Sequence, residues 1–258
     1  MQARIPFGRC PLCECPDLAD SAKADCSGHP LYHPSLNRLV QWKRCTRCGH
    51  VFTEGYFSDE ALKLIFSRTH EHQQAGVDLE QQRYVSARIV EKVLPYASSG
   101  TWLDVGFGNG SLLFTAQEYG FTPLGLDLRA DNVKAIAALG IEAHCKDIAD
   151  LSTDSACTVI SMADVLEHAP YPKKTLQAAR RLLSDSGVLF ISLPNMESML
   201  WKTMDQQRAN PYWAEIEHYH NFSRSRLYAL LREMGFEPVR YGISERYRAC
   251  MEVIARKA

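Results

Sequence analysis

The chain has 258 residues, of which 46% are hydrophobic and 23% charged, as is ordinary for a globular protein with one large domain and room for a small appendage. A formal net charge of −1 gives no overall attraction to nucleic acid or to an anionic membrane surface. No apolar run approaches the ~20 residues of a membrane span, and the N-terminus lacks the apolar core of a signal peptide, so we expect a cytoplasmic protein without a membrane partner.

Cysteines are concentrated at the start of the chain, where six of the nine precede residue 50. Without an export signal they indicate metal ligation rather than disulfides. Four of them form two C-x-x-C pairs, Cys10 with Cys13 and Cys45 with Cys48. Two such pairs supply the tetrahedral thiolate set that zinc prefers, with no position left open for catalysis. With Val51-Phe52 after the second pair they resemble a zinc ribbon, so residues 1–55 are predicted to form a structural zinc module.

The remaining cysteines and the nearby histidines are expected not to bind this metal. One group is spaced too irregularly and is expected at the surface or in packing: Cys15, Cys26, His29, His33 and His50. The other group lies in predicted strands and is expected in the core: Cys145, Cys157 and Cys250.

Residues 56–98 are predicted to form a helical cap. The segments 60–66 and 79–94 have the strongest helical pattern. The polar stretch 68–74 between them contains His70 and His72 and is expected to be a mobile stretch or a lid.

Residues 101–127 carry the strongest motif. An apolar run at 102–105 predicts a buried strand, and the three glycines at 106, 108 and 110 then allow a sharp turn that a ligand can approach closely. A helix is predicted at 111–119, ended by Gly120, and a second strand at 121–126, ended by Asp127. An acid about 20 residues beyond such a turn can accept both ribose hydroxyls of a bound nucleoside.

The acid before the turn selects among nucleoside cofactors. Asp104 ends the first strand, and its carboxylate would repel a pyrophosphate but suits the ammonium group of an amino acid. The run Asp104-Val-Gly106-Phe-Gly108-Asn-Gly110 resembles motif I of the class I S-adenosylmethionine-dependent methyltransferases. The alternative is a structural turn in some other α/β protein.

The chain from about residue 83 onward follows the same family in sequence order. Further strands are predicted at 141–145, 157–163, 188–193, 236–241 and 247–255, and helices at 172–183 and 224–234, the last capped by Ser223. The runs D-V-L-E-H at 164–168 and S-L-P-N at 192–195 match the group that modifies small molecules. The resemblance implies an α/β fold over residues 99–258, a Rossmann-like, doubly wound sheet of seven strands.

The resemblance also assigns residues to the cofactor. Asp147 is expected to bind the adenine amino group and Ile148 to cover the ring. Tyr84 is expected to touch the methionine end, or alternatively to pack on an amphipathic helix. The full set expected to bind S-adenosylmethionine is Asp104, Gly106, Phe107, Gly108, Gly110, Asp127, Leu128, Asp147, Ile148, Ala163, Asp164 and Tyr84.

Residues 196–223 are expected to form a substrate-binding insertion, with a helix over 196–212 followed by a segment rich in polar aromatic side chains. A general base assists methyl transfer to a hydroxyl or a carbon acid. The candidates are His168, His218 and His220. The pair Glu167-His168 can instead hold its own loop by hydrogen bonds.

The prediction is therefore an S-adenosylmethionine-dependent methyltransferase that acts on a hydroxyl or carbon of a small metabolite, such as a nucleotide-linked sugar or a secondary metabolite. The D/N-P-P-Y/F pattern typical of acceptors with planar nitrogens is replaced here by Asp164-Val-Leu-Glu167. One alternative is an RNA methyltransferase that recognises RNA through the zinc module, since residues 1–50 carry seven basic against four acidic side chains. Another is a non-catalytic protein with a zinc-mediated partner contact. The acceptor and the oligomeric state are left open.

Overall fold

The computed structural model describes residues 4–66, 74–152 and 156–258, which form two compact units. Each unit is assembled from separate stretches of the chain. Unit 1 comprises Met1–His70, Glu167–Pro172 and Pro194–Leu227, and unit 2 comprises Glu71–Leu166, Lys173–Leu193 and Tyr228–Ala258. The lid predicted at 68–74, with His70 and His72, lies outside the described residues except for Gln74.

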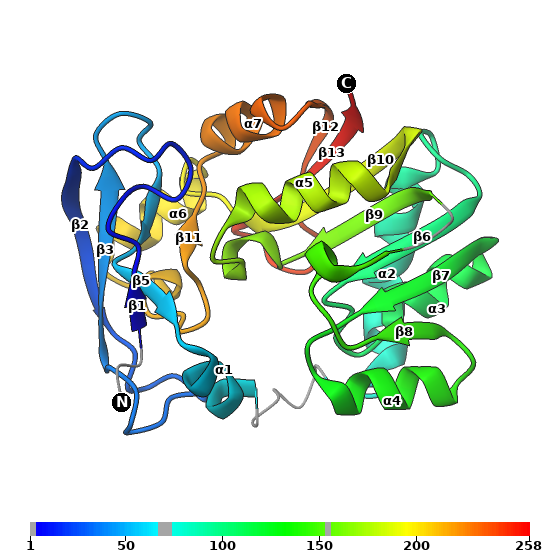
Figure 1. Ribbon diagram of the computed structural model, residues 1–258, viewed down its shortest axis with the longest axis horizontal. Coiled ribbons are helices and arrows are strands. Elements are labelled where there is room, and N and C mark those ends of the chain that lie inside the picture. The colour runs from blue at the N-terminus through cyan, green and yellow to red at the C-terminus, as the bar shows by residue number, and fades with distance from the viewer. Residues whose placement is uncertain (1–3, 67–73, 153–155) are drawn as a thin grey trace. The chain divides into compact units, whose positions relative to one another are not determined.

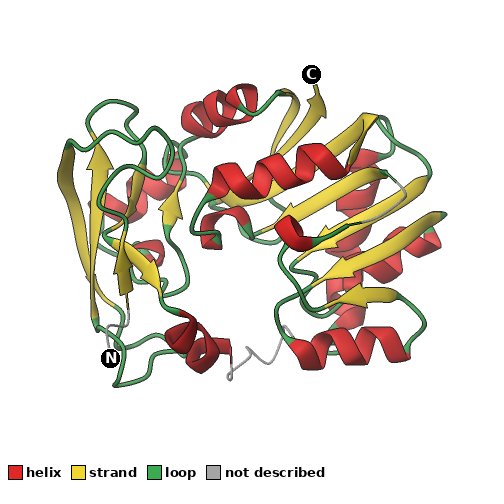
Figure 2. Ribbon diagram, in the orientation of Figure 1, coloured by secondary structure: helices red, strands yellow, loops and turns green. Residues whose placement is uncertain are grey.

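Unit 2 alternates strands and helices (Figures 1 and 2). Its α-helices are α2 (Leu79–Val93), α3 (Ser111–Glu118), α4 (Ala130–Ala138), α5 (Pro172–Leu182) and most of α7 (Arg224–Glu233). Its strands are β6 (Gly100–Val105), β7 (Phe121–Leu126), β8 (Glu142–His144), β9 (Cys157–Ala163), β10 (Leu183–Pro194), β12 (Phe236–Ile243) and β13 (Cys250–Lys257). A short 3-10 helix at Ile148–Asp150 follows β8, and another at Leu166–His168 follows β9, its last two residues belonging to unit 1.

The seven strands of unit 2 form one sheet in the order β12-β13-β10-β9-β6-β7-β8. The pairs from β10 to β8 are parallel, and β12 pairs with β13 antiparallel. Chain order reverses between β6 and β9, which is the point where open α/β sheets bind ligands at the carboxyl ends of their strands. This sheet confirms the predicted doubly wound fold.

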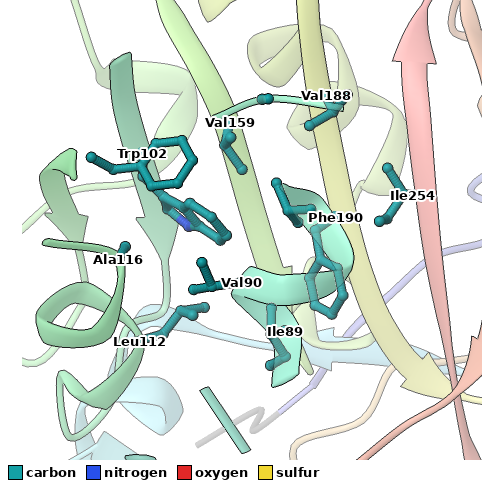
Figure 3. Close-up of a cluster of buried hydrophobic side chains, with 12 residues drawn as sticks. Ile89, Val90, Trp102, Leu112, Ala116, Val159, Val188, Phe190 and Ile254 are labelled. Carbon is teal, nitrogen blue, oxygen red and sulfur yellow. The ribbon is translucent and has the colours of Figure 1, made fainter. Parts of the chain in front are cut away.

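The unit 2 core lies between the sheet and helices α2 and α3 (Figure 3). Trp102 of β6 is fully buried, stacks edge-on against Phe121 and donates its indole N–H to the Ser161 hydroxyl at 2.8 Å. Val90 and Leu112 reach the same cluster from the two helices. Burial of this side-chain set fixes β6, and with it the turn that follows.

Unit 1 contains a four-stranded sheet in the order β11-β4-β3-β2 and a two-stranded pair, β1 with β5. Its strands are β1 (Arg4–Pro6), β2 (Leu18–Asp25), β3 (Leu39–Cys45), β4 (Val51–Thr53), β5 (Gly55–Phe57) and β11 (His220–Asn221). Its helices are α1 (Asp59–Phe66), α6 (Met199–Gln206) and a 3-10 turn at Pro211–Trp213. Strand β11 therefore extends the sheet of the cysteine-rich segment.

The structure corrects two predictions. The helix predicted at 196–212 spans only Met199–Gln206. Ser198 caps its start by accepting the Trp201 N–H at 3.1 Å. Arg208 adopts a left-handed φ of 53° just after its end. Cys145 is exposed just beyond β8 and is not a core residue, whereas Cys157 and Cys250 are buried. Across the described ranges, every helix is too short or too polar to cross a bilayer.

Candidate functional site

The glycine turn joins β6 to α3, and each of its three glycines has a positive φ: 68° at Gly106, 56° at Gly108 and 83° at Gly110. A Cβ on Gly110 would lie 2.4 Å from Ile136 Cδ1, and one on Gly106 would lie 2.8 Å from Val165 Cγ2. A Cβ on Gly108 would meet nothing within 4 Å. Packing therefore requires the outer two glycines, while the middle one borders open space that a ligand can enter.

Asp127 lies at the end of β7 and holds the turn from the side. Its carboxylate accepts the Gly108 N–H at 3.1 Å and the Arg129 N–H at 2.8 Å, and the residue is only 4% exposed. Burial raises the pKa of this carboxyl above its usual value. A buried carboxylate bonded to the backbone of the turn is well placed to accept further donors, such as ribose hydroxyls.

Asp104 lies at the end of β6, 3% exposed, and accepts the Ser161 hydroxyl at 2.6 Å. Burial raises the pKa of its carboxyl to about 7. The Ser161 hydrogen bond and the positive charge of Arg246 lower this pKa, but by less than burial raises it. A carboxyl that is half protonated near neutral pH gains from a cation beside it. The two carboxylates are hydrogen-bond acceptors, and they thus fit the ammonium group and the ribose hydroxyls of S-adenosylmethionine, which donate.

The other residues predicted at the cofactor occupy varied positions. Asp147 is exposed and caps the following 3-10 turn through the Ala149 N–H at 2.8 Å, while Ile148 beside it is buried. Phe107 packs its ring into a cluster with Leu113 and Ile136. Its N–H donates to the Leu126 carbonyl and its carbonyl accepts the Gly110 N–H, so this residue serves the packing of the turn.

Four more residues predicted to contact the cofactor differ in their exposure. Tyr84 is 63% exposed and lies beside Arg88, whose guanidinium is 5.3 Å from its ring centre, and Leu128 is 51% exposed. Ala163 is half-buried at the end of β9, and the next residue, Asp164, has a φ of 58° and accepts the Ser192 hydroxyl at 3.1 Å. The cofactor roles of these side chains stay predictions.

Several residues around the turn were missed from the sequence. Asn109 donates to the Val77 carbonyl at 2.9 Å and accepts the Ser111 N–H, tying the segment before α2 to the glycine turn. Its position between Gly108 and Gly110 of the glycine motif could have identified Asn109 from the sequence. Arg246 lies 3.6 Å from Asp164 yet follows it by 82 positions, and nothing in the local sequence indicates this pairing.

In unit 1 the two C-x-x-C pairs come together. The Sγ atoms of Cys10 and Cys48 are 3.7 Å apart, those of Cys13 and Cys45 are 3.5 Å apart, and all four lie within 4.8 Å of one another. A tetrahedron with Zn–S bonds of about 2.3 Å has edges of about 3.8 Å. The four thiols therefore fit a zinc ion, and the structure bears out the ribbon-like arrangement.

The three candidate bases also lie in unit 1, but their environments differ. His220 is fully buried, with Nδ1 3.0 Å from His50 Nε2 and Nε2 2.9 Å from the Ala169 carbonyl oxygen. Burial lowers the pKa of His220 to about 3. With both ring nitrogens engaged, His220 of β11 links His50, which precedes β4, to Ala169.

His168 and His218 lie together. Their ring centres are 4.7 Å apart with the planes at 83°, and Glu167 offers a carboxylate oxygen within 4.8 Å of a nitrogen of each. Burial, followed by the charge of His168, lowers the pKa of His218 to about 3. The structure thus joins two of the three predicted histidines, and adds Glu167, which the sequence analysis treated only as a loop residue.

Comparison with known proteins agrees with this geometry. A model described as a methyltransferase domain matches residues 79–241, well over half of the chain. The chain is 35% identical over 103 residues to a protein named ubiquinone biosynthesis O-methyltransferase from Paracidovorax citrulli, covering 36% of this chain and 43% of that one. A second protein of that name, from Bordetella avium, is 28% identical over 148 residues, covering 53% of this chain and 61% of that one. The chain therefore spans about half the length of these relatives.

Solved structures show the same fold. The Burkholderia thailandensis 1,6-didemethyltoxoflavin-N1-methyltransferase with bound S-adenosylhomocysteine superposes with a TM-score of 0.57 at 17% identity, covering 83% of this chain and 98% of that one. The matched domain includes the glycine turn, both strand-end acids and β9. The chain therefore belongs to the class I S-adenosylmethionine-dependent methyltransferase family.

Proposed function

We propose that this chain transfers the methyl group of S-adenosylmethionine to a hydroxyl group of a small metabolite. The observation that carries the proposal is the open space at Gly108, bordered by a turn that Asp127 holds and preceded on β6 by the buried carboxyl of Asp104. The bound cofactor would supply a sulfonium methyl with its leaving group already attached.

Each acid has a distinct part in holding the cofactor. Asp127 would accept the ribose hydroxyls with the lone pairs that the Gly108 and Arg129 N–H groups leave. Asp104 would face the ammonium group, and the new cation would favour its charged form, which burial disfavours. These contacts orient the methyl group, which is the main task of the protein in an in-line displacement.

A hydroxyl acceptor is supported by two observations. The relatives reported above carry the name O-methyltransferase. The segment after β9 reads Asp164-Val-Leu-Glu167 instead of the proline-containing pattern of planar nitrogen acceptors. An activated carbon in a small metabolite is the other acceptor that this segment allows.

Two histidines remain candidates for handling the proton of the acceptor. His220 has the least support of the three candidates, because both of its ring nitrogens are already bonded. His168 and His218 would act either as bases themselves or by holding an ion that lowers the pKa of the acceptor hydroxyl.

We also propose that Cys10, Cys13, Cys45 and Cys48 bind a structural zinc ion. The distances between their sulfurs support this assignment, and four thiolate ligands leave no open coordination position.

The basic side chains of the zinc module give little support to RNA binding. Arg38 and Lys43 pair with Asp25 and Asp20, and Arg4 is 5% exposed with its guanidinium 4.1 Å from the Phe57 ring centre. These contacts reduce the positive charge available to phosphates, and a small-molecule acceptor is the better assignment.

The test is calorimetric titration of the full chain with S-adenosylhomocysteine. Asp127→Ala is expected to weaken binding by about 1–3 kcal/mol through loss of charge-assisted hydrogen bonds. Asp131→Ala, which removes a fully exposed acid of α4, is the matched control and should leave affinity unchanged. Equal affinity in all three proteins would overturn the cofactor site.

Acceptor class is tested separately with cofactor labelled in its methyl group. We expect label to pass to members of a panel of phenols and catechols and not to total transfer RNA. Filter binding of RNA at low salt gives the converse measurement, and labelled RNA would overturn the acceptor assignment while leaving the cofactor site intact.

A further inference from the structure

A second cluster of potential metal ligands lies in unit 1, apart from the four cysteines. Glu167, His168 and His218 each offer one ligand atom, and the three atoms lie within 4.8 Å of one another. Glu167 is 1% exposed and His218 is 7% exposed. Two imidazoles and one carboxylate are the donor set of many catalytic zinc sites and of non-haem iron sites.

The backbone holds these side chains in place. The Tyr219 N–H donates to the Glu167 carbonyl at 2.9 Å, and His220 Nε2 bonds the Ala169 carbonyl at 2.9 Å. These bonds, with that of His168 to the Glu217 carbonyl, fasten residues 167–169 to 217–220. The cluster is therefore built by two paired segments and does not depend on a single loop.

The tautomer of His168 suits ligation. Its Nδ1 lies 3.0 Å from the Glu217 carbonyl oxygen, which can only accept a hydrogen bond, so Nδ1 carries the proton and Nε2 presents its lone pair. Histidines that bind metals characteristically donate their second nitrogen in this way to a backbone carbonyl or a carboxylate. The Glu217 carbonyl thus has the position of an outer-shell partner.

His218 supplies an independent indication. Its Nδ1 is buried and has no hydrogen-bond partner within the described parts of the chain. Leaving a buried polar atom without a hydrogen bond destabilises the folded state, and a metal ion bound there would remove this cost. The buried Glu167 carboxylate adds negative charge that a cation would offset. The Glu215 carboxylate, which bonds His29 at 2.6 Å, also acts electrostatically on both imidazoles.

We propose that Glu167, His168 and His218 bind a second divalent transition-metal ion of the zinc and cobalt class. Nitrogen ligands favour such an ion over magnesium or calcium, which prefer oxygen. Three protein ligands leave at least one coordination position for water or for an oxygen of a small molecule. Ligation and general-base duty exclude each other at the same nitrogen, so this site assigns His168 and His218 to the metal. Binding of this metal can be measured without cofactor or acceptor, so the test of the site does not depend on the test of methyl transfer.

Metal content of the full-length chain, loaded with zinc and freed of excess ion, tests the proposal without cofactor or acceptor. The wild type should hold two equivalents of zinc and His218→Ala one. Glu167→Gln, which keeps the side-chain volume, should weaken the second equivalent by at least about tenfold. The matched control His33→Ala alters a half-buried histidine of unit 1 that bonds locally to Ser35, and it should hold two equivalents.

Replacement of zinc by cobalt separates the two sites. Cobalt bound to Cys10, Cys13, Cys45 and Cys48 gives intense thiolate charge-transfer absorption, which reports that unit 1 is folded. That band should be unchanged in His218→Ala, while the weaker absorption of a second cobalt ion disappears. A single equivalent in the wild type, held by thiolates alone, would overturn the proposal, as would two equivalents retained by both His218→Ala and Glu167→Gln. If His218→Ala loses the thiolate band, unit 1 of that variant is unfolded and the variant is uninformative. The number of zinc equivalents in the wild type and in Glu167→Gln then decides whether the second site exists.

Discussion

Unit 2 draws its candidate cofactor residues from neighbouring strand ends, whereas unit 1 joins side chains that are far apart in the sequence. Asp104 and Asp127 end two strands that pair in parallel, so the register of the sheet alone brings them to one edge. In unit 1, His50 bonds His220 across 170 positions, and the Trp42 indole bonds the Trp213 carbonyl across 171. A local pattern can therefore reveal the first site, and only the folded chain reveals the second.

The units also differ in what stabilises them. Unit 2 has a continuous apolar core around Trp102 and Phe190, both fully buried. Unit 1 also has a buried apolar cluster, but it contains in addition four clustered thiols and two buried imidazoles, His50 and His218, whose Nδ1 atoms have no hydrogen bond within the described residues. We therefore expect the stability of unit 1, and not that of unit 2, to depend on metal.

The largest expected effect comes from removing the zinc proposed at the cysteines. Cys45→Ser should abolish zinc binding at the four-cysteine site, and because structural zinc contributes about 10–16 kcal/mol, unit 1 should lose its fold. Hydrogen exchange would then show loss of protection in β2 and β3 and retention in β6 and β9. Cys145→Ser, at an exposed cysteine of unit 2, is the control. It should change neither the zinc content nor the hydrogen-exchange protection of these strands. If the amides of β3 stay protected from exchange after the metal is lost, the stability of unit 1 does not depend on metal and the proposed difference between the units is wrong.

The next effect concerns the buried acid of unit 2. The carboxyl of Asp104 has a pKa of about 7 in the folded chain against an ordinary value of 3.8, so between these pH values the folded state holds more protons than the unfolded state. Its contribution to stability is fully present below pH 3.8 and is lost as pH rises to about 7. Asp104→Asn should remove this loss and raise the free energy of unfolding at pH 8 by at most about 4 kcal/mol.

Urea unfolding at pH 5 and pH 8, without cofactor, measures the effect of Asp104→Asn. The gain should be larger at pH 8, and the variant should bind S-adenosylhomocysteine more weakly than the wild type does. A gain of the same size at both pH values would show that the charge of Asp104 is not its cause. The expected result means that unit 2 sacrifices stability to keep an acid where a cation binds.

The sequence predicted the fold of unit 2 closely because its signals are local. The predicted strands at 121–126 and 157–163 match β7 and β9, and Ser223 caps α7 through the Arg226 N–H at 3.1 Å as expected. Alternation of short apolar runs with glycine and serine boundaries suffices for such elements. The four cysteines were found for the same reason, since their C-x-x-C spacing is itself the signal.

The cluster of Glu167, His168 and His218 could not be predicted in this way. Both histidines were candidates from the sequence, but no local pattern pairs 167–168 with a segment about 50 positions later. Residues 196–223 were predicted as an insertion of the methyltransferase domain, whereas the structure groups Pro194–Leu227 with the N-terminal segment. Pairing of β11 with β4 produces this grouping, and a two-residue strand has no periodicity to detect.

A smaller effect is expected in the glycine turn. Gly110→Ala would place its Cβ 2.4 Å from Ile136 at a φ of 83°, so we expect a loss of about 2–3 kcal/mol in the free energy of unfolding. Gly108→Ala, where nothing lies within 4 Å, should cost only about 1–2 kcal/mol. Urea unfolding measures the free energy of unfolding of Gly110→Ala and of Gly108→Ala against that of the wild type. Affinity for S-adenosylhomocysteine should fall more in Gly108→Ala, because its methyl group would enter the open space; a larger fall in Gly110→Ala would contradict the assignment of that space.

The smallest effect tests whether the insertion in unit 1 shares the metal dependence of the cysteine-rich segment. Ser198→Ala removes the cap of α6, which should cost about 1 kcal/mol in the metal-loaded protein. Tryptophan fluorescence can follow unit 1, because three of the four tryptophans, Trp42, Trp201 and Trp213, lie in it. In metal-free protein the substitution should have no effect, since α6 would already be unfolded. A cost of about 1 kcal/mol in both states would mean that α6 folds without metal, and the two units would then not differ in metal dependence as a whole.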